Sequence, residues 1–345
     1  MNKPAKVLML YTGGTIGMVQ DPKSKSLKPF NFESLLDRIP EISAMDCQID
    51  IDSFDEPIDS SNIKPIHWLR LGNRIAENYN DYDGFVILHG SDTMAYTASA
   101  LSFIIENISK PVILTGSQLP IGLARSDAKE NLITSIEIAT AKNEKGEPMV
   151  PEVCIYFEYN LYRGNRTHKI SAEDFEAFSS LNYDHLAVAG VNIKYNRADI
   201  APPSKLEIIV AKKWCENVGI INVFPGMSPS FVNSVLGNPE IKGFILRTFG
   251  SGNAPMDAWF LNILKETIDR GVYIANISQC LGGGVKQGKY EASQALLDMG
   301  VLEGGDMTLE AGLTKMMYLL AKNLDPLTFK KEYESNLRGE LSPSN

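Results

Sequence analysis

Two short polar loops in the sequence carry hydroxyl and carboxylate groups, and each loop follows an apolar run. Residues 12–15 are two threonines around two glycines, and they come soon after the run at residues 7–10. Ser91 and Asp92 come soon after a second apolar run at residues 85–88. Open parallel sheets bind ligands at the carboxyl ends of their strands, so neighbouring strands would bring these groups together. A single threonine at a strand end is usually a turn or cap residue, but the second loop makes coincidence a weaker explanation.

A hydroxyl nucleophile needs a nearby base, and the sequence offers no obvious histidine for that role. The four histidines are scattered and form neither a metal-ligand pattern nor a recognisable triad. His89 precedes Gly90 at a strand end, and we expect it to be a hydrogen-bonded structural residue. A lysine can act as a base when burial lowers its pKa, and Lys169 in the polar segment 163–169 is a candidate. On composition alone, Lys169 would be a solvated surface residue.

Nucleotide binding is disfavoured because two near-matches to phosphate loops each lack a required residue. Residues 283–289 fit the pattern G-x4-G-K, but Tyr290 follows where Ser or Thr would bind magnesium. Residues 12–17 follow a predicted strand, yet Thr12 replaces the first glycine of the dinucleotide fingerprint. The 33 basic and 42 acidic residues give a formal net charge of −9, which also disfavours binding to nucleic acid or an anionic membrane.

Composition and cysteine spacing indicate an ordinary globular protein of about two domains. The chain has 345 residues, of which 44% are hydrophobic and 22% are charged. Its four cysteines, at positions 47, 154, 215 and 280, show no CxxC spacing, which argues against a zinc site or a disulfide framework. The first apolar run is too short for a signal peptide or a spanning helix. We therefore expect a cytoplasmic location.

Short apolar runs alternate with amphipathic stretches along the chain, which is typical of parallel strands joined by crossover helices. Apolar residues at helical spacing predict helices near residues 94–105 and 309–320. The fold class expected is α/β, with mainly parallel sheets in a larger N-terminal and a smaller C-terminal domain. The expected boundaries are 1–195 for the N-terminal catalytic domain, 196–217 for a linker rich in proline and charge, and 218–345 for the C-terminal domain.

Six motifs are distributed along the chain. They are residues 11–17 (YTGGTIG), residues 59–61 (DSS), residues 89–96 (HGSDTMAY), residues 161–166 (LYRGNR), residues 245–255 (ILRTFGSGNAP) and residues 336–340 (NLRGE). The first three resemble the bacterial-type L-asparaginases, and the last three are similar to the cytoplasmic type I branch. The likeness extends over nearly the whole chain, and the YTGGTIG and HGSDTMAY motifs are highly specific when they occur together in this order.

The resemblance implies hydrolysis of L-asparagine to L-aspartate and ammonia through an acyl-enzyme, without a metal or an organic cofactor. By position, Thr15 would be the nucleophile. Ser91, Asp92 and Lys169 would form a second catalytic group that relays a proton, and Ser91 would also contact the substrate. Amide cleavage develops an oxyanion, and each backbone N–H group aimed at it would contribute about 10² to 10³ in rate.

The same resemblance implies a substrate site that a neighbouring subunit completes. Asp92 would bind the ammonium of asparagine, and Asp59, Ser60 and Ser61 would hold its α-carboxylate end. Asn253 matches a residue that acts across a subunit interface in relatives. The resemblance therefore implies a homo-oligomer, either a dimer or a tetramer.

Three features depart from the family pattern. Ser91 stands where the family usually has threonine, and Leu27 occupies the nearest match to a loop tyrosine. Some type I relatives have a second, activating asparagine site, which in this chain would involve Arg247, Cys280 and His168. His168 replaces a threonine of that site, so we expect weak allostery or none.

Two other function classes stay open on the sequence. One is the ammonia-supplying subunit of a tRNA-dependent amidotransferase, whose relatives carry an added N-terminal domain, whereas the first expected strand here lies near residue 7. The other is a non-catalytic amino-acid sensor, which would keep the binding groups without needing Lys169. The preference between asparagine and glutamine also stays open, because one methylene is worth only about 1–3 kcal/mol in a pocket.

Overall fold

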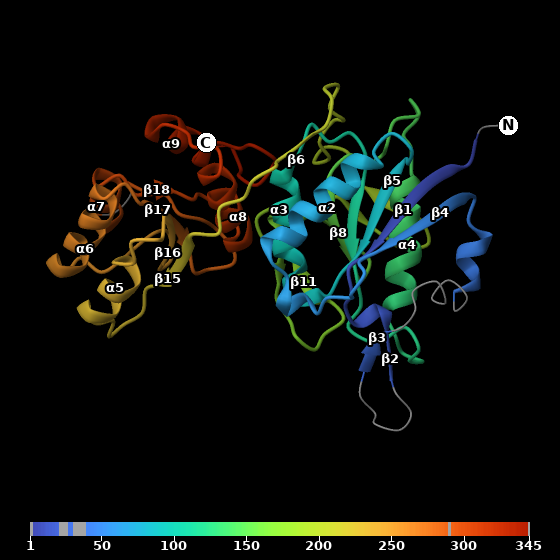
Figure 1. Cartoon of the computed structure of the whole chain (residues 1–345), viewed down its shortest axis with the longest axis horizontal. Coiled ribbons are helices and arrows are strands. Elements are labelled where there is room, and N and C mark those ends of the chain that lie inside the picture. The colour runs from blue at the N-terminus through green and yellow to red at the C-terminus, as the bar shows by residue number, and fades with distance from the viewer. Residues whose placement is uncertain (1–2, 21–26, 30–38, 289–290, 344–345) are drawn as a thin grey trace. The chain divides into compact units, whose positions relative to one another are not determined.

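The computed structural model describes residues 3–20, 27–29, 39–288 and 291–343 (Figure 1). The chain divides into two compact units, Met1–Ala211 and Lys212–Asn345. Each unit has a sheet with helices packed on it, and the N-terminal sheet is the larger. The α/β class expected from the sequence is therefore confirmed. The division lies inside the segment expected to be a linker, and the proposed domain boundaries stay a prediction.

The N-terminal unit is built on a mixed sheet. Within the described residues, its eight strands follow the order β13 (Lys194–Tyr195), β12 (Ala187–Val188), β9 (Asn160–Arg163), β8 (Val153–Phe157), β7 (Val112–Thr115), β5 (Gly84–Leu88), β1 (Ala5–Tyr11) and β4 (Cys47–Ser53). The five strands from β8 to β4 are parallel, and β9, β12 and β13 extend the sheet with antiparallel pairings. All residues of β5, β7 and β8 are buried, which is typical of central strands that are covered on both faces.

Three helices cover this sheet, namely α2 (Pro65–Glu77), α3 (Met94–Ile104) and α4 (Ala128–Thr140). Leu132 and Ile136 of α4 belong to a buried cluster with Met9 and Leu88 of the central strands. Helices α2 and α3 pack against each other, and Figure 1 shows them across the sheet from α4. The helix expected near residues 94–105 is confirmed as α3.

Short elements connect these helices and strands. They are the 3-10 helices η1 (Thr15–Gly17), η2 (Pro40–Ala44), η3 (Ser60–Asn62), η4 (Ser91–Thr93) and η5 (Gly164–Arg166), and the paired strands β2 (Met18–Gln20) with β3 (Leu27–Pro29), β10 (His168–Lys169) with β11 (Phe178–Ser179), and β6 (Ile105–Glu106) with β14 (Ile209–Val210). Three of the 3-10 helices, η1, η3 and η4, begin at expected site residues, so the site loops turn sharply where the chemistry is expected.

The strand order creates a ligand-binding position at one edge of the sheet. In the sheet, strand β1 lies between β4 and β5. Along the chain, β4 is the next strand of this sheet after β1, and β5 is the next after β4. The chain therefore leaves the carboxyl ends of β1 and β5 in opposite directions across the sheet. Open α/β sheets bind ligands at such a switch point. The loops after β1 and β5 contain residues 12–15 and 89–93, which are the two loops singled out in the sequence.

The C-terminal unit has a parallel sheet covered by helices on both faces (Figure 1). Its strands follow the order β15 (Val218–Asn222), β16 (Gly243–Thr248), β17 (Tyr273–Ser278) and β18 (Leu302–Glu303), and its helices are α5 (Pro229–Leu236), α6 (Ala258–Asp269), α7 (Glu291–Asp298), α8 (Leu309–Leu320) and α9 (Pro326–Tyr333). Phe244 and Leu246 of β16 pack with Phe260 and Leu264 of α6 in one buried cluster. The helix expected near residues 309–320 is confirmed as α8.

The NLRGE motif is held by a buried ion pair in the C-terminal unit. Lys315 Nζ lies 2.6 Å from the carboxylate of Glu340, and both side chains have no exposed area. The Glu340 carboxylate also accepts hydrogen bonds from the backbone N–H groups of Leu337 and Arg338. Buried charges are tolerated when they are paired in this way, so the motif has a structural role. In the described part of the chain, no helix is long and apolar enough to cross a membrane.

Candidate active site

The first loop leaves β1 in a backbone conformation that needs glycine. Thr12 is buried, and its Oγ1 and its backbone N–H both donate to the carbonyl of Leu88, at 2.9 and 3.0 Å. Gly13 and Gly14 then have φ angles of 130° and 92°, which L side chains rarely adopt. The chain enters η1 at the half-buried Thr15. The loop is thus tied to the neighbouring strand and presents Thr15 at the carboxyl edge of the sheet.

Three loops approach one another so closely that glycine is required at their contacts. A Cβ atom on Gly14 would lie 2.5 Å from the backbone nitrogen of Gly90, and one on Gly13 would lie 2.2 Å from the carbonyl oxygen of Ile58. A Cβ atom on Gly90 would lie 2.6 Å from Ser60 Oγ. Side chains at these positions would force the loops apart. The segments around residues 13–15, 58–61 and 90–92 therefore form one cluster.

Lys169 joins the second loop through its amine. Its Nζ donates to Ser91 Oγ at 2.8 Å and to Asp92 Oδ1 at 2.7 Å, and its side chain is only 16% exposed. The backbone of Lys169 pairs with Phe178 in the two-stranded β10–β11 sheet. A shielded amine between a hydroxyl and a carboxylate can accept and return a proton while the carboxylate stabilises its charged form.

A buried ion pair supports the segment that leads to Lys169. The guanidinium of Arg163 bonds to both carboxylate oxygens of Glu152, at 2.6 and 3.1 Å. Thr167 Oγ1 then donates to the carbonyl of Arg163 at 2.7 Å. A Cβ atom on Gly164 would lie 2.9 Å from Ala98 of α3, so this turn packs directly on the helix that begins at the second loop. The LYRGNR motif thus fixes the chain just before β10.

The third loop places Asp59 as the N-cap of η3. Its Oδ1 accepts from the backbone N–H and from the hydroxyl of Ser61, both at 2.9 Å. Such a contact satisfies helix-end N–H groups and orders the turn. Ser60 is buried, and its carbonyl accepts from Thr93 Oγ1 at 2.8 Å. The expected substrate-binding segment is therefore joined to the loop of Ser91.

Gln118 belongs to the same cluster, although it was not singled out in the sequence. Ser91 Oγ donates to Gln118 Oε1 at 3.1 Å, and Gln118 Nε2 donates to the carbonyl of Asp174 at 2.9 Å. The backbone N–H of Gln118 donates to the buried Asp127, whose pKa is raised by burial. Gln118 directly follows residues 115–117, where β7 ends in threonine, glycine and serine. No sequence pattern singles out the side-chain amide of Gln118.

The hydroxyl of Ser91 does not cap a helix. The residues at the N-caps of η4 and α3 are Gly90 and Thr93, and neither forms a side-chain cap hydrogen bond. The Ser91 hydroxyl bonds to Lys169 and Gln118 instead. The Ser91 hydroxyl is therefore directed at side chains of the cluster rather than at a helix-end N–H group.

Asn253 lies in the other compact unit, in a tight loop after β16. Its backbone N–H and carbonyl pair with Phe249 at 2.9 Å, and Gly252 between them has a φ angle of 114°. Asn276 Nδ2 donates to the carbonyl of Gly252, and Ser278 Oγ donates to that of Gly250, so β17 holds the loop. The expected role of Asn253 across a subunit interface stays a prediction.

Arg247 and Cys280 lie near each other at the carboxyl ends of β16 and β17. The guanidinium of Arg247 donates to the carbonyl of Gln279 at 3.1 Å, and the N–H of the exposed Cys280 donates to Ser278 Oγ at 3.0 Å. His168 is buried in the N-terminal unit beside Lys169. The expectation of weak or absent allostery stays a prediction.

Leu27 pairs with Gln20 between β2 and β3, but its side chain and the preceding Ser26 lie outside the described residues. The consequence of its departure from the usual tyrosine therefore stays a prediction. Within the described residues, no cluster of three or more His, Cys, Asp or Glu side chains is placed to hold a metal ion.

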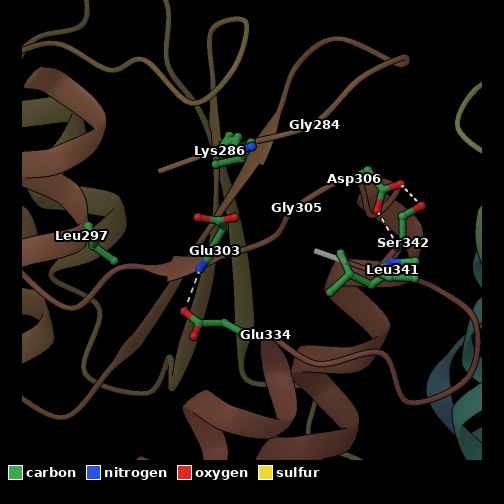
Figure 2. A pocket seen from close by; sticks show the side chains of 11 residues that line it. Gly284, Lys286, Leu297, Glu303, Gly305, Asp306, Glu334, Leu341 and Ser342 are labelled. Carbon is green, nitrogen blue, oxygen red and sulfur yellow. Dashed lines mark hydrogen bonds between the residues drawn. The ribbon is translucent and has the colours of Figure 1, made fainter. Parts of the chain in front are cut away.

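A pocket of about 590 Å³ in the C-terminal unit includes part of the segment that resembles a phosphate loop (Figure 2). Lys286 from that segment lines the pocket together with three acidic residues, Glu303, Asp306 and Glu334. Glu334 accepts from the N–H of Glu303, and Asp306 accepts from the N–H and hydroxyl of Ser342. Among the described residues that line this pocket, three carboxylates against one lysine disfavour a phosphate ligand. Lys289 and Tyr290 of the pattern lie outside the described residues.

Sequence profiles of two domains match the chain over most of its length. The profile described as "Asparaginase, N-terminal" matches residues 6–201, and the "Glutaminase/Asparaginase C-terminal domain" matches residues 217–332. The chain is also 42% identical over 338 residues to L-asparaginase 1 of Escherichia coli strain K12, and the match covers 98% of both chains. The chain belongs to the L-asparaginase family. The resemblance seen in the six motifs is therefore confirmed.

A solved structure and a further relative place the chain within this family. The crystal structure of L-asparaginase I from Vibrio cholerae is 40% identical, with a TM-score of 0.89, and the match covers 99% of this chain and all of that one. The chain is also 32% identical to a glutamyl-tRNA(Gln) amidotransferase subunit of Pyrococcus abyssi, over 98% of this chain and 77% of that protein. The sequence likeness thus extends to hydrolases and to an amidotransferase subunit.

Proposed function

We propose that this protein is an L-asparagine amidohydrolase that produces L-aspartate and ammonia through an ester on Thr15. The main support is the contact of Lys169 Nζ with Ser91 Oγ and Asp92 Oδ1, in a loop that packs directly against the loop of Thr15. Lys169 is distant in sequence from both partners, so the fold has gathered these three groups. Full-length similarity to L-asparaginase 1 supports the same substrate.

The proposed reaction has two stages, each with a balanced proton transfer. Thr15 Oγ attacks the side-chain amide carbon of asparagine, its proton passes through the catalytic groups to the amide nitrogen, and the C–N bond breaks to release ammonia. A water molecule then attacks the ester, and its proton returns to Thr15 as aspartate leaves. Lys169 and Ser91 accept and return protons, and Asp92 balances the charge of the amine.

We propose that the loops of the N-terminal unit also select a free amino acid. Asp92 is 66% exposed, so a carboxylate oxygen can reach a substrate ammonium. The segment Asp59, Ser60 and Ser61 offers hydroxyl and backbone N–H groups for the α-carboxylate. Pairing both charges of the substrate favours asparagine over amides that lack them, because unpaired groups would otherwise be buried.

Assembly and location extend the proposal. We expect a homo-oligomer, a dimer or a tetramer, in which Asn253 of one subunit completes the site of another. The proposed location is the cytoplasm, and no nucleic acid, membrane or organic cofactor is part of the reaction. These expectations follow from the family, whose C-terminal domain profile covers the segment that contains Asn253.

The amidotransferase subunit and the sensor are weaker proposals. The match to L-asparaginase 1 covers 98% of that protein, whereas the match to the amidotransferase subunit covers 77% of its length. A sensor would need the binding loops but no proton relay. The Lys169 contacts with Ser91 and Asp92 therefore favour the hydrolase.

Steady-state ammonia release tests the proposed function. The purified protein, with EDTA present and no metal added, is mixed with L-asparagine, L-glutamine or a simple amide. We expect ammonia and aspartate in equal amounts from asparagine, slower release from glutamine and none from the simple amide. Absence of ammonia above the buffer rate at millimolar asparagine would refute the proposal.

A further inference from the structure

Three buried side chains form a hydrogen-bonded chain that ends at the loop of Ser91. Trp68 Nε1 donates to Thr97 Oγ1 at 3.0 Å, Thr97 Oγ1 lies 2.9 Å from His89 Nε2, and His89 Nδ1 lies 2.7 Å from the carbonyl oxygen of Gly90. Trp68 comes from α2, Thr97 from α3, and His89 from the end of β5. The chain of hydrogen bonds therefore connects both helices on this face to the residue before Ser91.

The Gly90 carbonyl at one end can only accept and the Trp68 indole at the other can only donate, which fixes the position of every proton in these hydrogen bonds. The Gly90 carbonyl can only accept, so His89 must carry a hydrogen on Nδ1. His89 is almost fully buried, which holds its pKa at about 4, and the ring is therefore neutral near pH 7. Nε2 then has no hydrogen and accepts the hydroxyl proton of Thr97. The oxygen of Thr97 is left to accept from Trp68, whose indole can only donate.

This arrangement fixes the orientation of the peptide that carries Ser91. In a trans peptide the carbonyl and the next N–H point in opposite directions, so holding the Gly90 carbonyl also sets the plane from which Ser91 extends. Glycine at position 90 has no side chain to restrict that plane, since its backbone freedom is large. The hydrogen bond from His89 Nδ1 to the Gly90 carbonyl oxygen restrains that plane instead. Gly14 packs against the preceding peptide, because a Cβ atom at Gly14 would lie 2.5 Å from the Gly90 nitrogen.

We propose that His89 and Thr97 are positioning residues for the reaction, and that they act by orienting the Gly90–Ser91 peptide so that the Ser91 hydroxyl meets Lys169. This inference rests on the proposed function of Ser91. Both residues are buried, and they act through Ser91. His89, the first residue of the HGSDTMAY motif, and Thr97, directly after the motif, thus support the hydroxyl of Ser91. Trp68 of α2 forms the far end of this hydrogen-bonded chain.

A double-mutant cycle tests the inference. Thr97→Val keeps the shape of the side chain and removes the hydroxyl, whereas Thr97→Ser is the matched control that keeps it. Both changes are made in the wild-type chain, and Thr97→Val is also made in a Ser91→Ala background. The kcat and KM for asparagine and the thermal midpoint are measured for each variant. Residues that act as a unit give strongly non-additive losses.

We expect Thr97→Val to lower kcat by about tenfold or more, and Thr97→Ser to retain at least about half of the activity. In the Ser91→Ala background, Thr97→Val should cost less than about twofold, because its effect passes through Ser91. The inference is overturned if Thr97→Val leaves kcat within about twofold, or if it costs the same factor in both backgrounds. A fully active Ser91→Ala variant would instead contradict the proposed function of Ser91.

A measurement on the unaltered protein covers the case in which Thr97→Val does not fold. The protein is labelled with ¹⁵N-histidine, and His89 is assigned by the signal lost in His89→Gln. Long-range ¹H–¹⁵N spectra near pH 7 should show His89 with its hydrogen on Nδ1 and with no titration down to about pH 5. A hydrogen on Nε2, or titration near the ordinary histidine value of about 6.5, would overturn the inference.

Discussion

The change Ser91→Ala separates catalysis from stability. The Ser91 hydroxyl accepts from Lys169 Nζ at 2.8 Å and donates to Gln118 Oε1 at 3.1 Å. Its removal leaves Lys169 in contact with Asp92 and leaves the Gln118 amide in contact with the carbonyl of Asp174. Both partners thus keep one hydrogen bond each. The proton path through the hydroxyl is lost.

The structure predicts a small loss of stability and a large loss of activity for Ser91→Ala. Each partner keeps one hydrogen bond, and the released Oε1 belongs to the half-buried Gln118. The loss of folding free energy should therefore be about 1 kcal/mol or less, which moves the thermal midpoint of a unit of this size by about 2–4 °C. The loss of a positioned proton carrier should lower kcat by at least about 10², which corresponds to about 2.7 kcal/mol of barrier. Ser91→Thr keeps the hydroxyl, and its activity should stay within about tenfold, or about 1.4 kcal/mol.

The assay compares kcat and the thermal midpoint of the same three proteins, namely the wild type, Ser91→Ala and Ser91→Thr. Ammonia release is measured at saturating asparagine, and unfolding is followed by circular dichroism. A destabilised Ser91→Ala variant with full activity would show that the hydroxyl matters only for the fold. An inactive Ser91→Thr variant with an unchanged midpoint would show that the methyl group, rather than the hydroxyl, controls the geometry.

Three further predictions concern the base, the assembly and the buried histidine. Lys169→Met should lower kcat by at least about 10², and retention of more than a tenth of the activity would exclude Lys169 as the base. Light scattering at assay concentration should show a dimer or a tetramer, and a fully active monomer would contradict the role of Asn253. The dependence of rate on asparagine concentration should give a Hill coefficient near 1, and a coefficient above about 2 would show a working effector site despite His168. Burial lowers the pKa of His89 from 6.5 to about 4, so the unfolded chain binds a proton in this window that the folded chain does not. The unfolding free energy of the wild type should therefore fall as the pH falls from about 6.5 to about 4, by up to about 3 kcal/mol, and chemical denaturation of His89→Gln should show a shallower pH dependence.

The fold and two site loops could be predicted because local sequence encodes them. Apolar runs that end in glycine and hydroxyl residues marked the carboxyl ends of β1 and β5, and helical spacing marked α3 and α8. The contacts of Lys169 could not be predicted from spacing, since β10 is a two-residue strand without periodicity. The polar segment made Lys169 a candidate base, but only the resemblance to the L-asparaginases connected it with Ser91 and Asp92.

Long-range hydrogen bonds explain what the sequence did not show. Thr97 lies among apolar residues of α3, where its position indicates core packing, and no pattern links it to Trp68 or His89. The hydrogen bond from the N–H of Ala201 to the buried carboxylate of Glu152, at 2.6 Å, is a further long-range contact that no sequence pattern marked. The division between the two units, at Ala211 and Lys212, lies inside the segment 196–217 that was expected to be a linker.

The most direct test of the proposed nucleophile is the kcat of Thr15→Val with L-asparagine, measured beside the wild type in EDTA. Valine keeps the branched shape and removes the hydroxyl, so folding should be nearly unchanged. We predict equal amounts of aspartate and ammonia from the wild type, and a kcat about 10³ or more lower for the variant at the same thermal midpoint. A Thr15→Val protein that retains more than a tenth of the wild-type activity would contradict an ester on Thr15.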